Sequence, residues 1–193
     1  MTTDTSEKAF QNDIIAHLIS TGYHQRGNKN YNRASCIDPE LTLQFIQDTQ
    51  EREWKKFQRV YGEQSEQKFF YRMINELDKK GTINVLRNGF KDAGCHFELF
   101  YPKPNNRKNP DLFEQFKKNI FSAIDELEYE QKEDSKRLDL VISVNGLPII
   151  TIELKDTFSQ GVEWNIKKLK KEGDSLLVHR SPAGTESQNE KKG

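Results

Sequence analysis

Three side chains late in the chain have the types and the spacing for phosphodiester hydrolysis with a metal ion. Asp139 lies fourteen positions before Glu153, and Lys155 follows Glu153 after one leucine. Mg²⁺ prefers oxygen ligands and usually takes one or two carboxylates together with water and substrate phosphates. We expect Asp139 and Glu153 to supply those carboxylates, so that the metal activates a water and neutralises the phosphate. Lys155 is expected to stay protonated and to orient that water or stabilise the developing charge.

These residues lie in the segment RLDLVISVNGLPIITIELK, which predicts two strands around an Asn-Gly turn. A two-residue turn with an uninterrupted ladder brings Ile152 opposite Asp139 and places Glu153 on the other face of the sheet. A three-residue loop over 144–146, closed by a left-handed glycine as a bulge, brings Thr151 opposite Asp139 instead. Glu153 is then a diagonal neighbour of Asp139, at roughly 7–8 Å. The metal-site hypothesis therefore predicts a bulged turn.

The alternative is an ordinary hairpin whose polar positions face water. Charged residues make up 31% of the chain, so a D…ExK spacing also arises by chance. The context favours the metal site, because the run ITIELK is apolar except at the positions that the chemistry needs. Charged side chains that end a buried strand are costly unless they are paired or bind a metal.

The same run closely resembles the nuclease segment in the N-terminal domain of type I restriction enzyme R subunits (HsdR), which are members of the PD-(D/E)xK superfamily. Upstream blocks at 6–23, 34–57 and 77–104 resemble further parts of that domain, in the expected order. Together these blocks cover most of residues 6–178. Other PD-(D/E)xK enzymes, such as junction resolvases and repair nucleases, fit the upstream blocks less well.

The resemblance implies a restriction-endonuclease-like three-layer α/β/α core with a mixed central sheet and N-terminal helices. It also implies Mg²⁺-dependent cleavage of double-stranded DNA within a complex that includes methyltransferase and specificity subunits. By matching position, Asp139, Glu153 and Lys155 correspond to the catalytic trio, with Asp139 and Glu153 on the metal. Glu7 matches an acidic position in the family's opening motif; alternatively, it is a first-turn acid favoured by the helix dipole.

The chain departs from the family pattern at two places. The family usually carries a Gln-x-x-x-Tyr or Gln-Tyr motif on the helix after Glu-x-Lys, where this chain has Lys168-Leu169. The stretch 119–129 also lacks an Arg-Gln pair that is often found there. The lysines at 167–171 either contact DNA phosphates or form a solvated helix face.

Two functions from different classes remain open. The chain is either an endonuclease domain or a truncated, non-catalytic remnant or docking module of the same complex. Nothing in it resembles the GxxxxGK[ST] phosphate loop, so ATP is expected to act only through a translocase region outside this sequence. We expect residues 1–178 to form the nuclease-type domain and 179–193 a polar, disordered tail, and the chain to be a fragment, a frameshifted product or a free-standing domain.

Composition limits the other possibilities. Thirty basic and thirty acidic residues cancel, so any contact with DNA must come from a local patch. Cys36 and Cys95 do not suggest a disulfide framework or a zinc site. No run approaches the roughly 20 apolar residues of a membrane span, and the start lacks a signal-peptide core. We therefore expect a cytoplasmic protein without a membrane segment.

Hydrophobic periodicity places the supporting elements. Helices are expected where apolar residues recur every three or four positions, and strands where they alternate or cluster between turns. The expected helices cover 7–20, a stretch from Asp38-Pro39 to Phe57 that breaks near Thr49, 64–80 and 111–128; the expected strands are 96–101 and 175–178, and the expected loops are 24–33 and 102–110.

Overall fold

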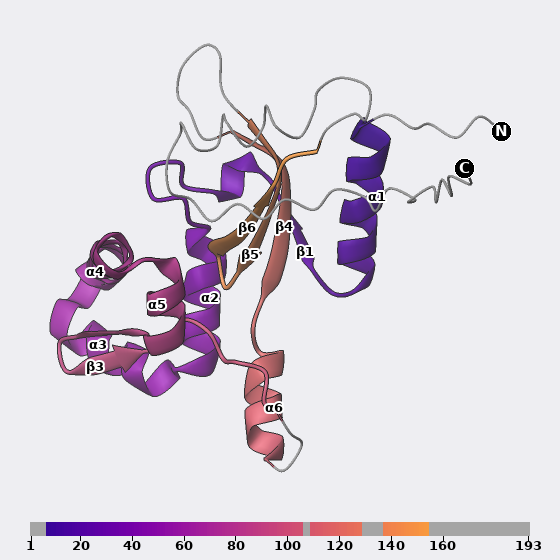
Figure 1. The fold of residues 1–193 in the computed structure, drawn as a ribbon. Helices are drawn as coiled ribbons and strands as arrows, with labels where there is room; N and C mark the ends of the chain where they lie inside the picture. The colour runs from indigo at the N-terminus through magenta and orange to yellow at the C-terminus, as the bar shows by residue number, and fades with distance from the viewer. Residues whose placement is uncertain (1–6, 106–108, 129–136, 155–193) are drawn as a thin grey trace, which may run out of the picture.

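Four strands form a mixed sheet that carries the candidate residues (Figure 1). The computed structural model describes residues 7–105, 109–128 and 137–154, and the sheet has the order β1-β4-β5-β6. The predicted α/β class with a mixed sheet is confirmed, and it is compatible with a restriction-endonuclease-like fold. β1 (His24–Arg26) runs parallel to β4 (Phe121–Glu128), which is antiparallel to β5 (Arg137–Val144), which in turn is antiparallel to β6 (Leu147–Ile152).

The two faces of the sheet are covered by different N-terminal segments. Successive residues of a strand point to opposite faces, so Leu140 and Val141 lie on different sides of β5. Leu140 packs with Ile15 of helix α1 (Glu7–Ser20). Val141 packs with Tyr31, which follows a short 3₁₀ turn, η1 (Asn28–Asn30). One face is therefore covered by a helix that precedes β1, and the other by the segment that follows β1.

A group of helices lies beside the end of the sheet at which β5 turns into β6 (Figure 1). Aromatic side chains, among them Trp54, Phe57, Phe69 and Phe97, form the centre of this group, with ring centroids 5.1–6.3 Å apart. Its elements are α2 (Pro39–Thr49), α3 (Glu51–Tyr61), the 3₁₀ turn η2 (Gly62–Gln64), α4 (Ser65–Lys80), α5 (Thr82–Asn88) and the small hairpin of β2 (Phe90–Asp92) and β3 (Cys95–Phe97). Val144 and Leu147, on either side of the β5–β6 turn, belong to the same core cluster.

Most of the predicted helices are confirmed. α1 spans 7–20, the long second segment divides into α2 and α3 at Gln50, and α4 ends before Gly81. Asp38 begins α2 as its N-cap, because its side chain accepts the N–H of Leu41 while Pro39 occupies the first turn. These helices are read correctly because their apolar residues follow the helical period.

Three other predictions are wrong or only partly right. The expected helix over 111–128 is instead α6 (Pro110–Lys117) followed by strand β4, whose residues are buried between β1 and β5. Tertiary pairing here overrides the helical propensity of the sequence AIDELE, in which Ala, Leu and Glu favour a helix. The expected loop over 24–33 contains strand β1, and the expected strand over 96–101 is paired only over 95–97. The strand at 175–178, the helix at 161–173 and the tail at 179–193 lie outside the described residues.

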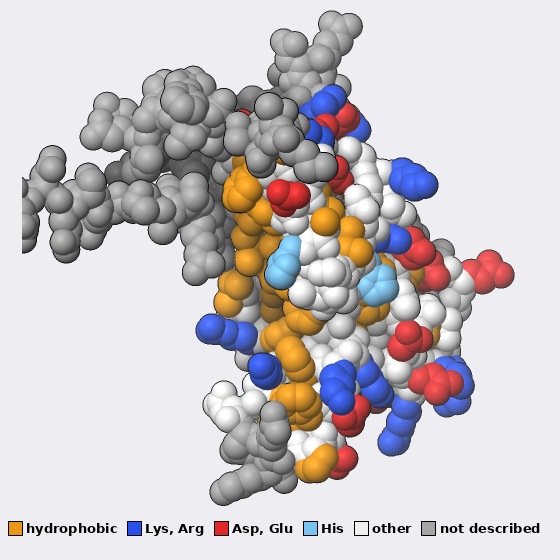
Figure 2. Space-filling model, turned by 90° about the vertical axis from the view of Figure 1, so that its right-hand side faces the viewer, with side chains coloured by type: hydrophobic (Ala, Val, Ile, Leu, Met, Phe, Trp, Pro, Cys, Tyr) orange, Lys and Arg blue, Asp and Glu red, His pale blue; other side chains and the backbone are white. Residues whose placement is uncertain are grey.

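α1 carries more apolar surface than the described sheet covers. Its Phe10 and Ile19 are exposed, and Figure 2, which views the side on which α1 lies, shows a band of hydrophobic side chains down this face. None of the helices among the described residues is long and apolar enough to span a membrane. The two cysteines are not joined in a disulfide, since Cys36 is exposed and Cys95 is buried, both as free thiols.

Candidate active site

The β5–β6 hairpin brings Asp139 and Glu153 opposite each other at the open end of the sheet. The last pair of the ladder joins Leu140 to Ile152, so the next position on each strand is Asp139 and Glu153. The backbone N–H of Leu154 donates to Oδ2 of Asp139 at 2.6 Å, which keeps the two strands together beyond the ladder. Directly opposite residues share a face, with Cβ atoms roughly 4.5–5.5 Å apart. Both carboxylates are half-buried and can approach one ion.

This pairing arises differently from the one that the sequence predicts. The turn is a two-residue loop of Asn145 and Gly146, and the predicted three-residue bulged turn is wrong. The extra residue lies in β6 instead, because Ser143 pairs with Pro148 while Ile142 pairs with Ile150, which leaves Ile149 as a bulge. Proline has no N–H for the ladder and is confined to edges and bulges within sheets, so Pro148 is the physical reason. The bulge shifts the register by one residue.

The turn itself is fixed by buried contacts. Asn145 and Gly146 have positive φ angles of 51° and 82°, as a tight hairpin turn with these residues requires. Asn145 is fully buried; its Oδ1 accepts the N–H of Ile120 at 2.7 Å, and its Nδ2 donates to the carbonyl of Leu99 at 2.9 Å. The Gly146 carbonyl accepts the N–H of Asp38 at 2.8 Å. The register that positions Asp139 is thus set at the opposite end of the hairpin.

Helix α1 supports the site through contacts with the backbone of β5. Gln11 is 4% exposed, and its Nε2 donates to the backbone carbonyl of Asp139. Its Oε1 accepts from Nζ of Lys8 at 3.1 Å. Glu7, which is exposed, begins the same helix four residues before Gln11 and therefore lies on the same helix face. Glu7 thus lies on the turn of α1 that carries Gln11, and this position also fits the alternative of a first-turn acid.

Further charged residues surround the site on β4. Glu126 lies opposite Asp139 in the β4–β5 register, but its φ of 50° removes it from the ladder. Its carboxylate accepts from Nζ of Lys8 at 2.5 Å, and Arg137 approaches it at 3.5 Å. The hydrogen bond and the positive charge of Lys8, assisted by Arg137, lower the pKa of Glu126, although partial burial opposes this shift. Lys8 also lies 3.9 Å from Asp125. Glu126 is thereby neutralised by a cation beside the two facing carboxylates.

Three supporting residues, Lys8, Gln11 and Glu126, were not predicted from the sequence. Gln11 offered a signal, because it is a polar residue on the apolar stripe of an amphipathic helix, and buried polar groups require a partner. Lys8 precedes it by three residues and therefore faces the same side. Glu126 offered none, since its stretch was interpreted as a helix.

Asp139 and Glu153 supply the one or two carboxylates that Mg²⁺ usually takes from a protein. No group of three His, Cys, Asp or Glu side chains within 7–105, 109–128 and 137–154 is arranged to hold a metal ion. Asp139 and Glu153 supply two carboxylates, and Mg²⁺ commonly completes its shell with water and substrate phosphate. One oxygen of Asp139 is occupied by the Leu154 N–H, which fixes the orientation of the other. Lys155, the third predicted residue, lies outside the described part of the chain.

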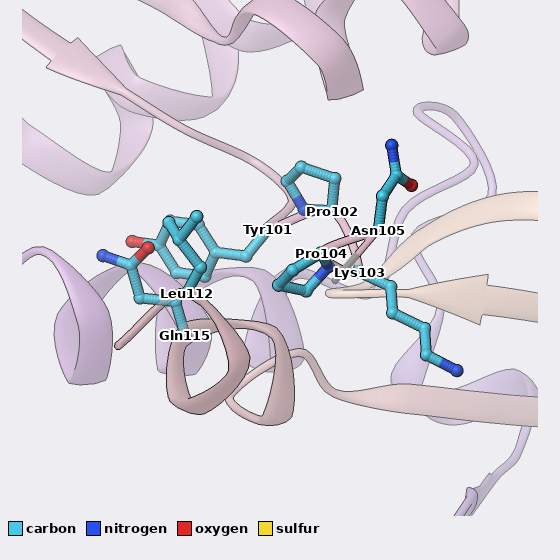
Figure 3. A pocket seen from close by; sticks show the side chains of 7 residues that line it. All are labelled: Tyr101, Pro102, Lys103, Pro104, Asn105, Leu112 and Gln115. Atoms are coloured by element: carbon cyan, nitrogen blue, oxygen red, sulfur yellow. The ribbon is translucent and has the colours of Figure 1, made fainter. Parts of the chain in front are cut away.

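A pocket of about 320 Å³ lies elsewhere, between the segment after β3 and helix α6. Tyr101, Pro102 and Pro104 line one side, and Leu112 and Gln115 of α6 line the other. Figure 3 shows Leu112 and Gln115 next to the Tyr101 ring, whereas Lys103 extends away from them. In Figure 1, α6 lies at the opposite end of the molecule from the open strand ends. This pocket is therefore separate from the carboxylate pair.

Comparison with protein families gives one match. The family model described as type I restriction enzyme R protein N terminus matches residues 4–180, which includes every residue of the site. Comparison with the curated proteins and with the solved structures found no match.

Proposed function

The chain belongs to the family of type I restriction enzyme R protein N-terminal regions, and from this premise we propose that it is the Mg²⁺-dependent endonuclease domain of such a subunit. The observation that carries the proposal is the pairing of Asp139 with Glu153 across β5 and β6. Two carboxylates face each other at a sheet end where a buried glutamine holds the strand and a lysine neutralises the neighbouring acid. An ordinary solvated hairpin has no need of this support.

Each residue has a separate part in the proposed chemistry. Asp139 and Glu153 would hold Mg²⁺, which when bound supplies an activated water and neutralises the scissile phosphate. Asp139 is oriented through its bond to the Leu154 N–H, and Lys155 follows Leu154 directly in the sequence. We propose that Lys155 stays protonated and orients the attacking water or stabilises the charge on the phosphate. Gln11 is a positioning residue, since it bonds to Asp139 through the backbone carbonyl and also accepts from Lys8.

The proposed partners follow from the family. The substrate is double-stranded DNA, and the methyltransferase and specificity subunits of a type I restriction complex select the site. ATP acts through a translocase region that is not among these 193 residues. The replacement of the family's glutamine motif by Lys168-Leu169 favours a second candidate, a non-catalytic docking module of the same complex.

Plasmid cleavage by the purified protein tests the proposal. We expect the parent to nick or cut supercoiled plasmid with Mg²⁺ or Mn²⁺, and Asp139→Asn and Glu153→Gln each to lower the rate by at least about 100-fold, as loss of a metal-site interaction does. Glu114→Gln, an exposed change on α6, is the matched control and should cut like the parent. Equal cutting by all four proteins would show a contaminating nuclease. A parent that cuts nothing would favour the docking module.

A further inference from the structure

The outermost line of α3 carries basic side chains. Arg52, Lys55, Lys56 and Arg59, which we call the α3 basic face, are exposed and recur at intervals of three and four residues. Successive side chains of an α-helix are about 100° apart around its axis. On that spacing, the four basic side chains point away from the buried side chains of α3, among them Trp54. The helix therefore buries its aromatic side and presents a row of cations along its outermost line.

The α3 basic face forms a shallow hollow of about 430 Å³, and within the described ranges Glu51 is the only other residue that lines it. Lys55 is paired with Glu51, and Lys56 donates to the backbone carbonyl of Gly94 at 2.5 Å. Arg52 and Arg59 have no hydrogen bond or ion pair to any residue of the described ranges. Two lysines are thus held by the protein, while two guanidinium groups remain available to a ligand.

A solvated helix face explains this arrangement less well. Alternating signs of charge along a helix face are typical of a solvated surface, and the whole chain has no excess of basic residues. The second acid of the helix, Glu53, follows Arg52 directly, so it lies about 100° further around the helix, to one side of the outer line. Only the Glu51 carboxylate reduces the positive charge of the hollow. A local concentration of cations on a neutral protein points to an anionic partner.

We propose that the α3 basic face binds the phosphate backbone of double-stranded DNA, without regard to sequence. The inference rests on the proposed function for the identity of the polyanion. Arg52 and Arg59 are separated by two helical turns, or about 10 Å, at 1.5 Å per residue. One DNA strand places a phosphate every 3.4 Å or so along the helix axis, so about three phosphates fit this length. The arginine forks suit phosphate oxygens, which they bind in bidentate fashion.

The α3 basic face is remote from the carboxylate pair. In Figure 1, α3 lies at the lower left, whereas the open ends of β4, β5 and β6 lie at the top. The face therefore contributes to holding the duplex and not to the reaction at the phosphate that is cut. Its binding should require neither a divalent metal nor Asp139.

Fluorescence anisotropy with a short labelled duplex in EDTA tests this inference, because no cutting occurs there. We expect R52E/R59E to weaken binding by at least about tenfold and to reduce the log–log salt slope by about two, since each phosphate contact contributes about 0.9. R52Q/R59Q adds no acid and should show a smaller loss in the same direction. K29E/K118E makes the same charge change at two other exposed lysines and should bind like the parent. Circular dichroism confirms that each variant is folded.

The outcomes separate this inference from the proposed function. D139N should bind the duplex as the parent does, even if it no longer cuts. If the parent binds the duplex but never cuts, and R52E/R59E loses binding, the α3 inference stands and the proposed nuclease activity is overturned. Parent-like binding by R52E/R59E, or an equal loss of binding in K29E/K118E, would overturn the proposal that the α3 basic face binds DNA.

Discussion

The two ends of the β5–β6 hairpin differ in burial and in charge. At the closed end, Asn145 and Gly146 are buried, and the Asn145 side chain bonds to three neighbouring groups. At the open end, Asp139 and Glu153 are half-buried and negatively charged, and like charges directly opposite each other are unfavourable in a sheet. The hairpin therefore gains its stability at one end and holds its unfavourable charges at the other. Proteins commonly accept such local costs at functional sites.

The largest expected effect comes from filling the space at Gly146. A Cβ built there would lie 2.3 Å from the Asp38 carbonyl oxygen and 2.4 Å from Oγ1 of Thr42. We expect Gly146→Ala to lower the free energy of unfolding by more than about 4 kcal/mol, because a backbone clash adds to the cost of the positive φ. Urea denaturation followed by circular dichroism measures this loss.

Gly22→Ala is the matched control for that change. Gly22 also has a positive φ, of 100°, but no atom of the residues that the structure describes lies within 4 Å of the place that a Cβ would take there. Its cost should be limited to the backbone conformation, about 1–2 kcal/mol. Equal losses at the two glycines would contradict the role of close packing at the closed end.

A smaller effect is expected from removing the Asn145 side chain. Asn145→Ala leaves the Ile120 N–H and the Leu99 carbonyl without their side-chain partner, and Oδ1 of Asn119 keeps only the N–H of Tyr101 as a donor among the described residues. Buried groups left unsatisfied cost about 1–3 kcal/mol each, so a loss of about 3–4 kcal/mol in unfolding free energy is expected. Asn12→Ala, on the exposed side of α1, should not destabilise. A loss below about 1 kcal/mol at Asn145 would show that water replaces the network.

A substitution at the open end of the hairpin should hardly change the stability of the fold. Asp139→Asn keeps an oxygen for the Leu154 N–H and removes the repulsion by Glu153, so the two effects offset each other. We expect the free energy of unfolding to change by no more than about 1 kcal/mol, the size of one exchanged hydrogen bond. Urea denaturation without metal gives the value. A loss as large as that of Asn145→Ala would mean that Asp139 is a structural residue.

The smallest expected effect is on how the stability of the fold changes at acidic pH. Lys8 lowers the pKa of Glu126 below its ordinary value of 4.5, so this pair stabilises the fold above that value and ceases to do so as the pH falls through the lowered pKa. Lys8→Met should therefore reduce stability near neutral pH and flatten its decline on acidification. Urea midpoints at several pH values measure the difference, and Lys118→Met, at an exposed position, serves as control. An unchanged pH profile in Lys8→Met would show that the pair does not stabilise the fold.

The sequence correctly predicts the elements in which the spacing of apolar residues alone indicates the secondary structure. α1, α2, α3 and α4 follow the helical repeat of apolar residues, and the strands around Asn145-Gly146 follow the hairpin signal. β4 does not, because its Ala, Glu and Leu residues favour a helix locally and become a strand only between β1 and β5. Local pattern is sufficient where an element packs by its own amphipathicity, and insufficient where neighbouring strands decide.

The sequence identifies Asp139 and Glu153 as candidates, but it does not predict how the structure brings them opposite each other. The choice of Asp139 and Glu153 needed only residue types and spacing, whereas their register depends on the bulge that Pro148 imposes. It depends also on contacts of the turn with Asp38 and Thr42, which lie far away in the sequence. Long-range contacts of this kind are not visible in the hairpin's own residues.

Calorimetric titration of Mn²⁺ and Mg²⁺ into the protein, beside Asp139→Asn and Glu153→Gln, tests most directly whether the two facing carboxylates form one metal site. We predict a single binding event for Mn²⁺ in the parent and its loss in both variants, while all three proteins unfold at similar urea concentrations. Metal binding of equal strength in the parent and in both variants would contradict a metal site at Asp139 and Glu153.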